Sequence, residues 1–170
     1  MIPNLLPRHR LDAGTFGTMG VGPGFAIAAA LYVKRFDPGA RVVCIEGDSA
    51  FGFSGMEVET IARYNLPIVI LVVNNNGIYS GFERGVYDEV TEDGEPGLAV
   101  PPTALLPRVR YDRLADLIGA EGKLVSTQQE VSTALQAALA TDTFTIINLM
   151  INPTASRKAQ QHEWLTKAKL

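Results

Sequence analysis

Two apolar segments that each end in a polar cluster constrain this chain more than any other feature. The first, Arg41 to Glu46, is followed by Gly47-Asp48-Ser49. The second, Pro67 to Val73, is followed by Asn74-Asn75-Asn76-Gly77. A segment with helical character, Ser54 to Asn65, separates them. This order predicts a β-α-β unit with two parallel strands and a right-handed crossover.

Asp48 and Asn75 then both lie just beyond the carboxyl ends of their strands. In open α/β sheets ligands bind at that edge. A carboxylate and an amide oxygen are hard ligands, which suit a divalent cation such as Mg²⁺ bound together with a phosphate. The sequence therefore predicts a cation and phosphate site between the two strand ends.

The other segments continue the alternation of helix and strand. They are a short strand at Leu11 to Ala13, a helix at Ala26 to Phe36, a short helix at Asp112 to Ile118, a strand at Lys123 to Ser126, a helix capped by Thr127 and running to Ala140, and a strand at Phe144 to Ile151. We expect an α/β fold: a doubly wound, mostly parallel sheet of five or six strands with helices on both faces. Residues 1–170 are expected to form a single domain.

Two local features of the sequence, a candidate helix cap at Ser54 and a glycine-rich stretch, give further expectations. Ser54 is a plausible N-cap of the crossover helix with Glu57 as its capping-box partner, so Glu57 and Glu59 are interpreted as a cap and a solvated face rather than catalytic acids. The glycine-rich stretch from Gly14 to Gly24 lacks a Gly-Lys-Ser/Thr sequence. Its glycines allow close approach either to a ligand or to a neighbouring helix.

The segment 80–108 is polar, rich in turn residues and long for a connection inside a domain. It is expected to be a functional loop or a segment that orders on binding. Arg84, Tyr87 and Arg108 are within it and are able to contact an anionic ligand, although solvated loop residues are the favoured interpretation.

Composition excludes several classes of function. The net charge of −3 argues against a nucleic-acid partner. The single cysteine, Cys44, lies in an apolar strand, which excludes an intrachain disulfide and a zinc constellation and favours a buried side chain. No apolar run reaches the roughly 18 residues that a membrane span needs, and the amino terminus has no signal-peptide pattern.

The last segment, 152–170, is interpreted as a tail and a candidate lid. It ends in Ala168-Lys169-Leu170, which is close to the Ser-Lys-Leu peroxisomal address. The expected location is the peroxisome if the organism is eukaryotic and the cytoplasm if it is bacterial.

The two polar clusters resemble the thiamine diphosphate signature, which is Gly-Asp-Gly followed, after a little under thirty residues, by Asn-Asn. Here Ser49 takes the third position, and 26 residues separate Asp48 from Asn75. The loop Gly17-Thr18-Met19-Gly20 is similar to the loop beneath the cofactor in that family. The resemblance implies that Met19 wedges the cofactor into its bent form and that the carbonyl of Gly17 accepts a hydrogen bond from its aminopyrimidine.

The same resemblance implies a set of ligands. Mg²⁺ would bind the carboxylate of Asp48, the side-chain oxygen of Asn75 and the carbonyl of Gly77, with two diphosphate oxygens and a water. The cofactor-binding residues implied by the family are Gly17, Thr18, Met19, Gly47, Asp48, Ser49, Ala50, Asn75, Gly77, Ile78 and Tyr79. Among them, Ser49 and Ala50 would donate to phosphate, and Ile78 and Tyr79 would flank the diphosphate and thiazolium.

Within the superfamily, the amino-acid sequence around the motifs resembles that of 2-hydroxyacyl-CoA lyase, with oxalyl-CoA decarboxylase as a near relative. The segments that carry it are PRHRLDAGTFGTMGVG, EGDSAFGFSGMEVETIARYNLPI, VVNNNGIY and INPTASRKAQ followed by WLT. The implied reaction cleaves a 2-hydroxyacyl-CoA to formyl-CoA and a shortened aldehyde, or runs in reverse. Ser156, Arg157 and Lys158 would contact the phosphates of the acyl-CoA substrate or close over the site.

The resemblance also implies a missing part. In this family a glutamate on a separate pyrimidine-binding domain helps to activate the cofactor, and these 170 residues do not supply it. The chain is therefore expected to lack lyase activity alone, as a fragment or a small subunit, and to work in a homo- or hetero-oligomer. Two alternatives stay open: a catalytically silent cofactor-binding or interaction module, and a nicotinamide-binding domain.

Overall fold

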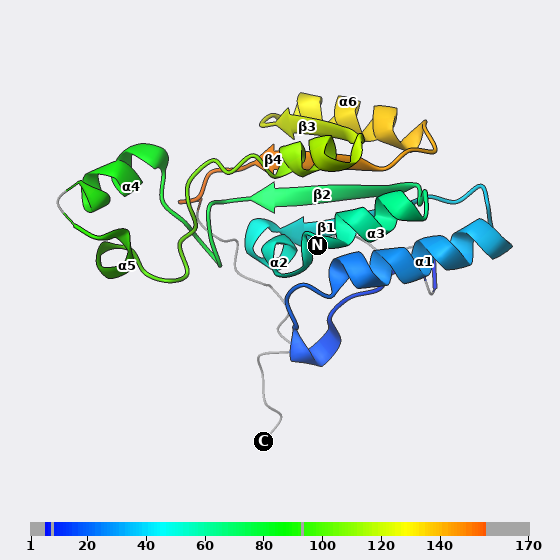
Figure 1. Ribbon diagram of the computed structural model, residues 1–170, viewed down its shortest axis with the longest axis horizontal. Coiled ribbons are helices and arrows are strands. Elements are labelled where there is room, and N and C mark those ends of the chain that lie inside the picture. The colour runs from blue at the N-terminus through cyan, green and yellow to red at the C-terminus, as the bar shows by residue number, and fades with distance from the viewer. Residues whose placement is uncertain (1–5, 8, 93, 156–170) are drawn as a thin grey trace, which may run out of the picture.

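Four parallel strands form the centre of the computed structural model, which describes residues 6–7, 9–92 and 94–155 (Figure 1). The strands are β1 (Val42–Gly47), β2 (Ile68–Asn74), β3 (Glu121–Val125) and β4 (Thr145–Met150), in the spatial order β1-β2-β4-β3. The register pairs Val42 with Ile68 and Val69 with Thr145, so β1, β2 and β4 end close together. The predicted parallel β-α-β unit is confirmed.

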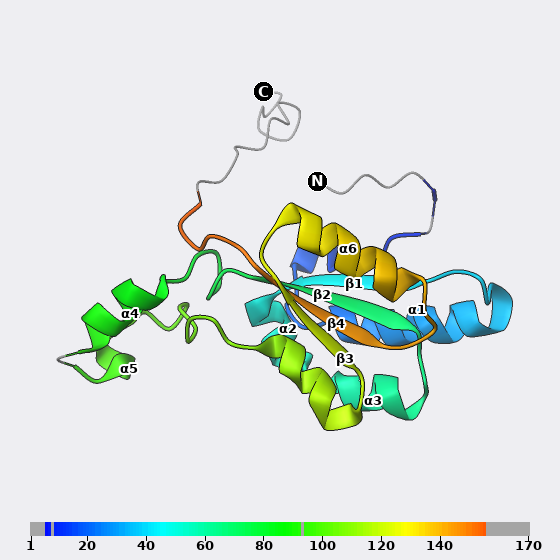
Figure 2. The same cartoon turned by 90° about the horizontal axis from the view of Figure 1, so that it is seen from above.

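Helices cover both faces of this sheet, as the sequence predicted (Figure 2). One face is covered by α1 (Gly22–Phe36), α2 (Asp48–Ser54), α3 (Glu57–Arg63) and the 3₁₀ helix η2 (Tyr111–Ile118), and the other by α6 (Gln128–Leu139). Alternate side chains of β2 serve the two cores: Ile70 packs with Phe51 and Ile61, whereas Val69 packs with Ala134. The central strand is apolar throughout because both of its faces are buried.

Two predictions about the sheet need correction. The described residues contain four strands, not five or six. Leu11 to Ala13 form no strand and lead instead into a 3₁₀ helix, η1 (Gly14–Phe16). In the described part of the chain β1 is consequently an edge strand, and its side chains Val43 and Ile45 are 39% and 46% exposed.

The crossover between β1 and β2 is two short helices, where the sequence predicted one. Helix α2 ends at Ser54, and α3 begins at Glu57 after a turn at Gly55-Met56. Ser54 is therefore not the N-cap of the crossover helix, and Glu57 has no capping-box partner. The hydroxyl of Ser54 donates instead to the carbonyl of Gly20, 2.7 Å away. Ser54 thus makes a tertiary hydrogen bond to Gly20 in place of the local N-cap that the sequence predicted.

The cap predicted at Thr127 for the last helix is confirmed, and the structure shows that it is a capping box. The backbone nitrogen of Glu130 donates to Oγ1 of Thr127 over 3.2 Å, and Oε2 of Glu130 accepts from the backbone nitrogen of Thr127 over 3.0 Å. The 3₁₀ helix η2 ends at Gly119, whose φ of 67° is in the left-handed region that glycine tolerates.

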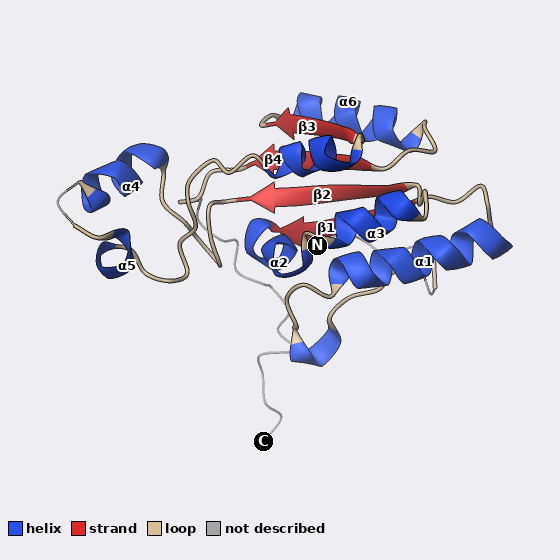
Figure 3. Cartoon of the chain, in the orientation of Figure 1, coloured by secondary structure: helices blue, strands red, loops and turns tan. Residues whose placement is uncertain are grey.

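The long connection after β2 contains two helices that lie beyond the end of the sheet (Figure 3). They are α4 (Arg84–Thr91) and α5 (Pro96–Ala99), and neither contains a buried residue. None of the helices in the described ranges is both long enough and apolar enough to cross a membrane. Of the proposed lid, 152–170, only residues 152–155 are described, and residues 156–170 lie outside the described residues.

Candidate functional site

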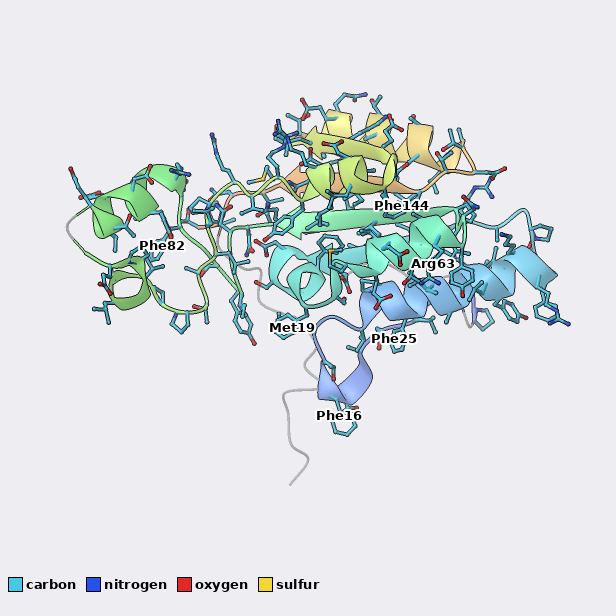
Figure 4. All side chains as sticks on the ribbon, viewed as in Figure 1. Phe16, Met19, Phe25, Arg63, Phe82 and Phe144 are labelled. Carbon is cyan, nitrogen blue, oxygen red and sulfur yellow. The ribbon has the colours of Figure 1, made fainter. Side chains whose placement is uncertain are left out.

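A cleft of about 390 Å³ lies at the carboxyl ends of β1 and β2. It is open on one side and is closed on the other by the start of α2 and by the stretch that leads into α1. Its lining residues are Met19, Gly47, Asp48, Ser49, Ala50, Val73, Asn75, Gly77, Ile78, Tyr79 and Ile151. Figure 4 shows Met19 beside α2, on the segment that precedes α1.

The structure brings nine of the eleven predicted site residues to this one cleft. The other two, Gly17 and Thr18, are exposed on the neighbouring loop and do not line it. Val73 and Ile151 line the cleft without having been predicted. Ile151 directly follows β4, and its place just past the end of a third parallel strand is the signal that would have identified it.

Asp48 is the buried charge of the cleft. The residue is 1% exposed, and its carboxylate accepts hydrogen bonds from the backbone nitrogens of Ser49, at 2.9 Å, and Gly77, at 3.0 Å. Burial raises the pKa of Asp48, and these backbone hydrogen bonds offset part of that effect. In the described part of the chain no cationic side chain pairs with it, so this carboxylate lacks a compensating positive charge.

Asn75 is oriented by the turn in which it lies. Its side-chain Nδ2 donates to the backbone carbonyl of Tyr79 over 2.8 Å. Its backbone carbonyl accepts from the backbone nitrogen of Gly81 over 3.1 Å. The amide oxygen is therefore the end of the side chain that remains for a cation. Tyr79 has a φ of 67°, an uncommon conformation for a bulky residue that is often found at functional sites.

The residues of the cleft fit a cation bound with a phosphate. The hydroxyl of Ser49 is buried and has no hydrogen-bond partner among the described residues, so it has a proton to offer to an anion. No group of three acidic, histidine or cysteine side chains able to hold a metal occurs in the described ranges. A cation here would need ligands from its anion, which is how Mg²⁺ is commonly bound.

A buried polar network supports the strand ends. Nδ2 of Asn74, on β2, donates to Oδ1 of Asn148, on β4, over 3.2 Å, and Nδ2 of Asn148 donates to Asp112 over 3.2 Å. Both asparagines also donate to the carbonyl of Val109, and Arg110 pairs with Asp112 at 2.5 Å. Sequence reasoning missed Asn148 and Asp112, because nothing local indicates that they meet.

Asn76 organises the turn after β2. Its side chain donates to the carbonyl of Phe82 at 2.9 Å and accepts from the nitrogen of Arg108 at 2.9 Å. Oδ1 of Asn74 accepts from its backbone nitrogen at 3.1 Å. The residues on either side of Asn75 are thus structural, and only Asn75 faces the cleft.

The remaining candidates lie elsewhere. Arg84 is on α4 and pairs with Asp88 at 2.9 Å, and neither Tyr87 nor Arg108 lines the cleft. Glu59 is exposed and pairs with Arg63 at 3.0 Å, which agrees with the solvated face predicted for it. The tail residues Ser156, Arg157 and Lys158 lie outside the described residues.

Residues 1–149 match the family described as "Thiamine pyrophosphate enzyme, C-terminal TPP binding domain". Thiamine pyrophosphate is the same compound as thiamine diphosphate. The chain is 54% identical over its whole length to 2-hydroxyacyl-CoA lyase 1 of Mus musculus, of which it covers 29%. It is 47% identical, over 90% of its length, to oxalyl-CoA decarboxylase of Escherichia coli K12, of which it covers 25%.

The fold resembles that of a solved benzoylformate decarboxylase from Polynucleobacter necessarius. The TM-score is 0.64, the sequences are 21% identical, and the match covers 84% of this chain and 25% of the other. The chain thus spans about a quarter to three tenths of the length of the proteins that it matches. A family match that includes the glycine-rich segment also shows that the nicotinamide-binding alternative is wrong.

Proposed function

Because the chain belongs to the thiamine pyrophosphate enzymes as their C-terminal TPP binding domain, we propose that the β1–β2 cleft holds thiamine diphosphate and Mg²⁺. The observation that carries this proposal is the buried carboxylate of Asp48, which lies beside the turn of Asn75 and Gly77 and has no cationic partner in the described ranges. A bound Mg²⁺ would compensate that charge.

In this proposal each residue of the cleft has a stated task. Asp48, the amide oxygen of Asn75 and the carbonyl of Gly77 would bind the cation. The hydroxyl of Ser49, together with the backbone of Ser49 and Ala50 in the first turn of α2, would donate to the diphosphate.

The apolar residues of the cleft would hold the organic part of the cofactor. Met19 would support its bent form, while Ile78 and Tyr79 flank it. Gly17 and Thr18 would contribute only through the loop that carries Met19, since they do not line the cleft themselves. When bound, thiamine diphosphate supplies the nucleophilic carbon for breaking or forming the carbon–carbon bond.

We propose that the whole protein is a carbon–carbon lyase acting on a 2-hydroxyacyl-CoA, with formyl-CoA and a shortened aldehyde as products. The support is the 54% identity to 2-hydroxyacyl-CoA lyase 1 along the full chain. Oxalyl-CoA decarboxylase is the second candidate, supported by the relative from Escherichia coli. A pyrimidine-binding domain carrying the catalytic glutamate would come from the part that these 170 residues do not contain, within the same polypeptide or an oligomer.

Calorimetry with the purified chain tests the cofactor proposal. We expect thiamine diphosphate to bind in the presence of Mg²⁺ and to bind much more weakly after chelation of the metal. Failure to bind with Mg²⁺ present would favour a catalytically silent interaction module that does not bind the cofactor.

An assay with formyl-CoA and an aldehyde tests the proposed dependence on a partner. The chain alone should give no product, and addition of a polypeptide with the pyrimidine-binding domain should restore turnover. Activity of the chain alone would contradict the proposal. Oxalyl-CoA, supplied as the competing substrate, separates the lyase from the decarboxylase.

A further inference from the structure

Two side chains that do not line the cleft hold the segment that carries Met19. The first is Ser54, the last residue of α2, whose Oγ donates to the carbonyl of Gly20 over 2.7 Å. Gly20 also lies against α2 directly: a Cβ atom added to it would be 2.6 Å from the Cβ of Phe53. With a φ of 84° this position needs a glycine. The residue after Met19 is therefore fixed on the helix that begins with Asp48.

The second side chain is Glu46 on β1, two residues before Asp48. Its carboxyl group lies against Gly22, the first residue of α1, so closely that a Cβ atom on Gly22 would overlap it. Oε2 of this carboxyl group is buried without a hydrogen-bond partner among the described residues. The half-buried carboxyl group of Glu46 therefore contacts the start of α1.

Both contacts join the same two parts of the molecule. Gly20 and Gly22 follow Met19 by one and three residues, and Ser54 and Glu46 belong to the β1–α2 unit that presents Asp48. On the side of the cleft where the cation would bind, the proposed ligands Asn75 and Gly77 are held by the turn after β2. The position of Met19 relative to Asp48 is thus set by Ser54 and Glu46 independently of the β2 turn.

We propose that Ser54 and Glu46 are positioning residues that hold Met19 at the depth of the cleft which the organic part of thiamine diphosphate requires. This inference rests on the proposed function. It implies that variants of Ser54 or Glu46 affect the binding of two ligands differently. Binding of thiamine diphosphate becomes weaker, because this ligand contacts Met19. Binding of inorganic pyrophosphate stays unchanged, because pyrophosphate needs only the strand ends.

The test is calorimetry of the full 170-residue chain with Mg²⁺ and either ligand. Ser54→Ala should raise the Kd for thiamine diphosphate about tenfold, the effect of one lost hydrogen bond, and Glu46→Ala, which loses the contact with Gly22, should raise it by a similar factor. The Kd for pyrophosphate should stay within about twofold, well below that effect. Glu46→Gln should behave like the wild type, since it keeps the size and shape of the side chain that lies against Gly22. Ser132→Ala, on the exposed surface of α6, is the matched control.

A double substitution tests whether the effect passes through Met19. In the Met19→Ala background Ser54→Ala should have little further effect on thiamine diphosphate. Equal losses for both ligands, full additivity with Met19→Ala, or no loss in either variant would overturn the inference. A wild-type chain that binds neither ligand would overturn the proposed function as well, so the two failures are distinguishable. If Ser54→Ala does not fold, the comparison of Glu46→Ala with Glu46→Gln decides.

Discussion

The backbone nitrogen of Gly77 donates to Oδ2 of Asp48 across 3.0 Å, and this single bond joins the end of β1 to the turn after β2. The same Gly77 presents the carbonyl that we propose as a metal ligand. A Cβ atom on Gly77 would lie 2.7 Å from the carbonyl oxygen of Thr103, so the chain passes here too closely for any other residue. The proposed ligands are therefore held together before a cation arrives, which lowers the entropic cost of binding it.

Asp48→Ala should abolish Mg²⁺-dependent binding of thiamine diphosphate and leave the fold intact. We expect affinity to fall by more than about 100-fold, since even loss of an outer partner of a metal ligand costs about 10- to 100-fold. Removing the buried charge also removes its desolvation cost, which offsets the two lost hydrogen bonds. Calorimetry and far-UV circular dichroism are the measurements, with exposed Asp37→Ala as control. Unchanged affinity in Asp48→Ala would refute the assigned ligand.

Asn148→Ala should destabilise the chain markedly although it touches no proposed ligand. The substitution removes one hydrogen bond each from Asp112, Asn74 and the carbonyl of Val109, although Asp112 keeps Arg110 and Asn74 still donates to Val109. The loss of three buried hydrogen bonds, at roughly 0.5–1.5 kcal/mol each, should lower the free energy of unfolding by about 2–4 kcal/mol. Urea unfolding measures the change, and Gln136→Ala, at an exposed position of α6, should alter it by less than about 0.5 kcal/mol. Equal stability of the two variants would show that the network contributes nothing.

The carboxylate of Asp112 gives the stability a dependence on acid. Burial raises its pKa, but hydrogen bonds from Arg110 and Asn148 outweigh burial, and the pKa lies below its ordinary value. A group with a lowered folded-state pKa contributes stability above its unfolded pKa, about 3.9, and loses it as the pH falls through the folded pKa. Asp112→Asn should therefore be less stable than the wild type at neutral pH.

The difference should shrink as the pH falls below about 4, because the wild-type carboxylate is then protonated as well. Chemical denaturation at a series of pH values between neutral and strongly acidic provides the comparison. The exposed variant Asp37→Asn serves as the background. A gap between Asp112→Asn and wild type that stays constant with pH would mean that the charge of Asp112 is not what stabilises the network.

The parts of the fold that could be predicted are those with a local cause. The strand β2 is apolar along its length because it is buried on both faces, and the helix α6 could be predicted from its N-cap, Thr127. Asp48 directly follows β1 and Asn75 directly follows β2, so the parallel pairing of these strands alone places both residues at one edge of the sheet. That Asp48 and Asn75 lie at the same edge could be predicted because only the parallel pairing of β1 and β2 was needed.

What could not be predicted depends on contacts between distant segments. Ser54 follows the local rule for an N-cap, yet Gly20, 34 residues earlier, is its partner. Asn148 reads as an ordinary polar residue in an apolar strand, and its role exists only because β4 lies next to β2 and beneath residues 109–112. The predicted number of strands was wrong for a different reason: Leu11 to Ala13 includes aspartate and alanine, which are depleted in strands, and forms no strand in the structure.

Gly81→Ala should disturb the turn of Asn75 to Gly77, although position 81 does not line the cleft. A Cβ atom there would overlap the backbone of Asn76, and backbone atoms have no rotamer with which to move aside. We expect a destabilisation of about 1–3 kcal/mol, as for other overpacked positions. Binding of Mg²⁺ with pyrophosphate should weaken too, because Asn75 is oriented by this turn: its carbonyl accepts from Gly81 itself.

Gly85→Ala is the matched control for that experiment. Gly85 lies in α4, and a Cβ atom there would meet nothing within 4 Å, so alanine should stabilise the helix by about 0.5–1 kcal/mol. Thermal unfolding and pyrophosphate calorimetry of the two variants give opposite signs of stability change and a loss of binding in one only. If Gly81→Ala bound pyrophosphate as tightly as Gly85→Ala, the orientation of Asn75 would not depend on the close contact between residues 76 and 81.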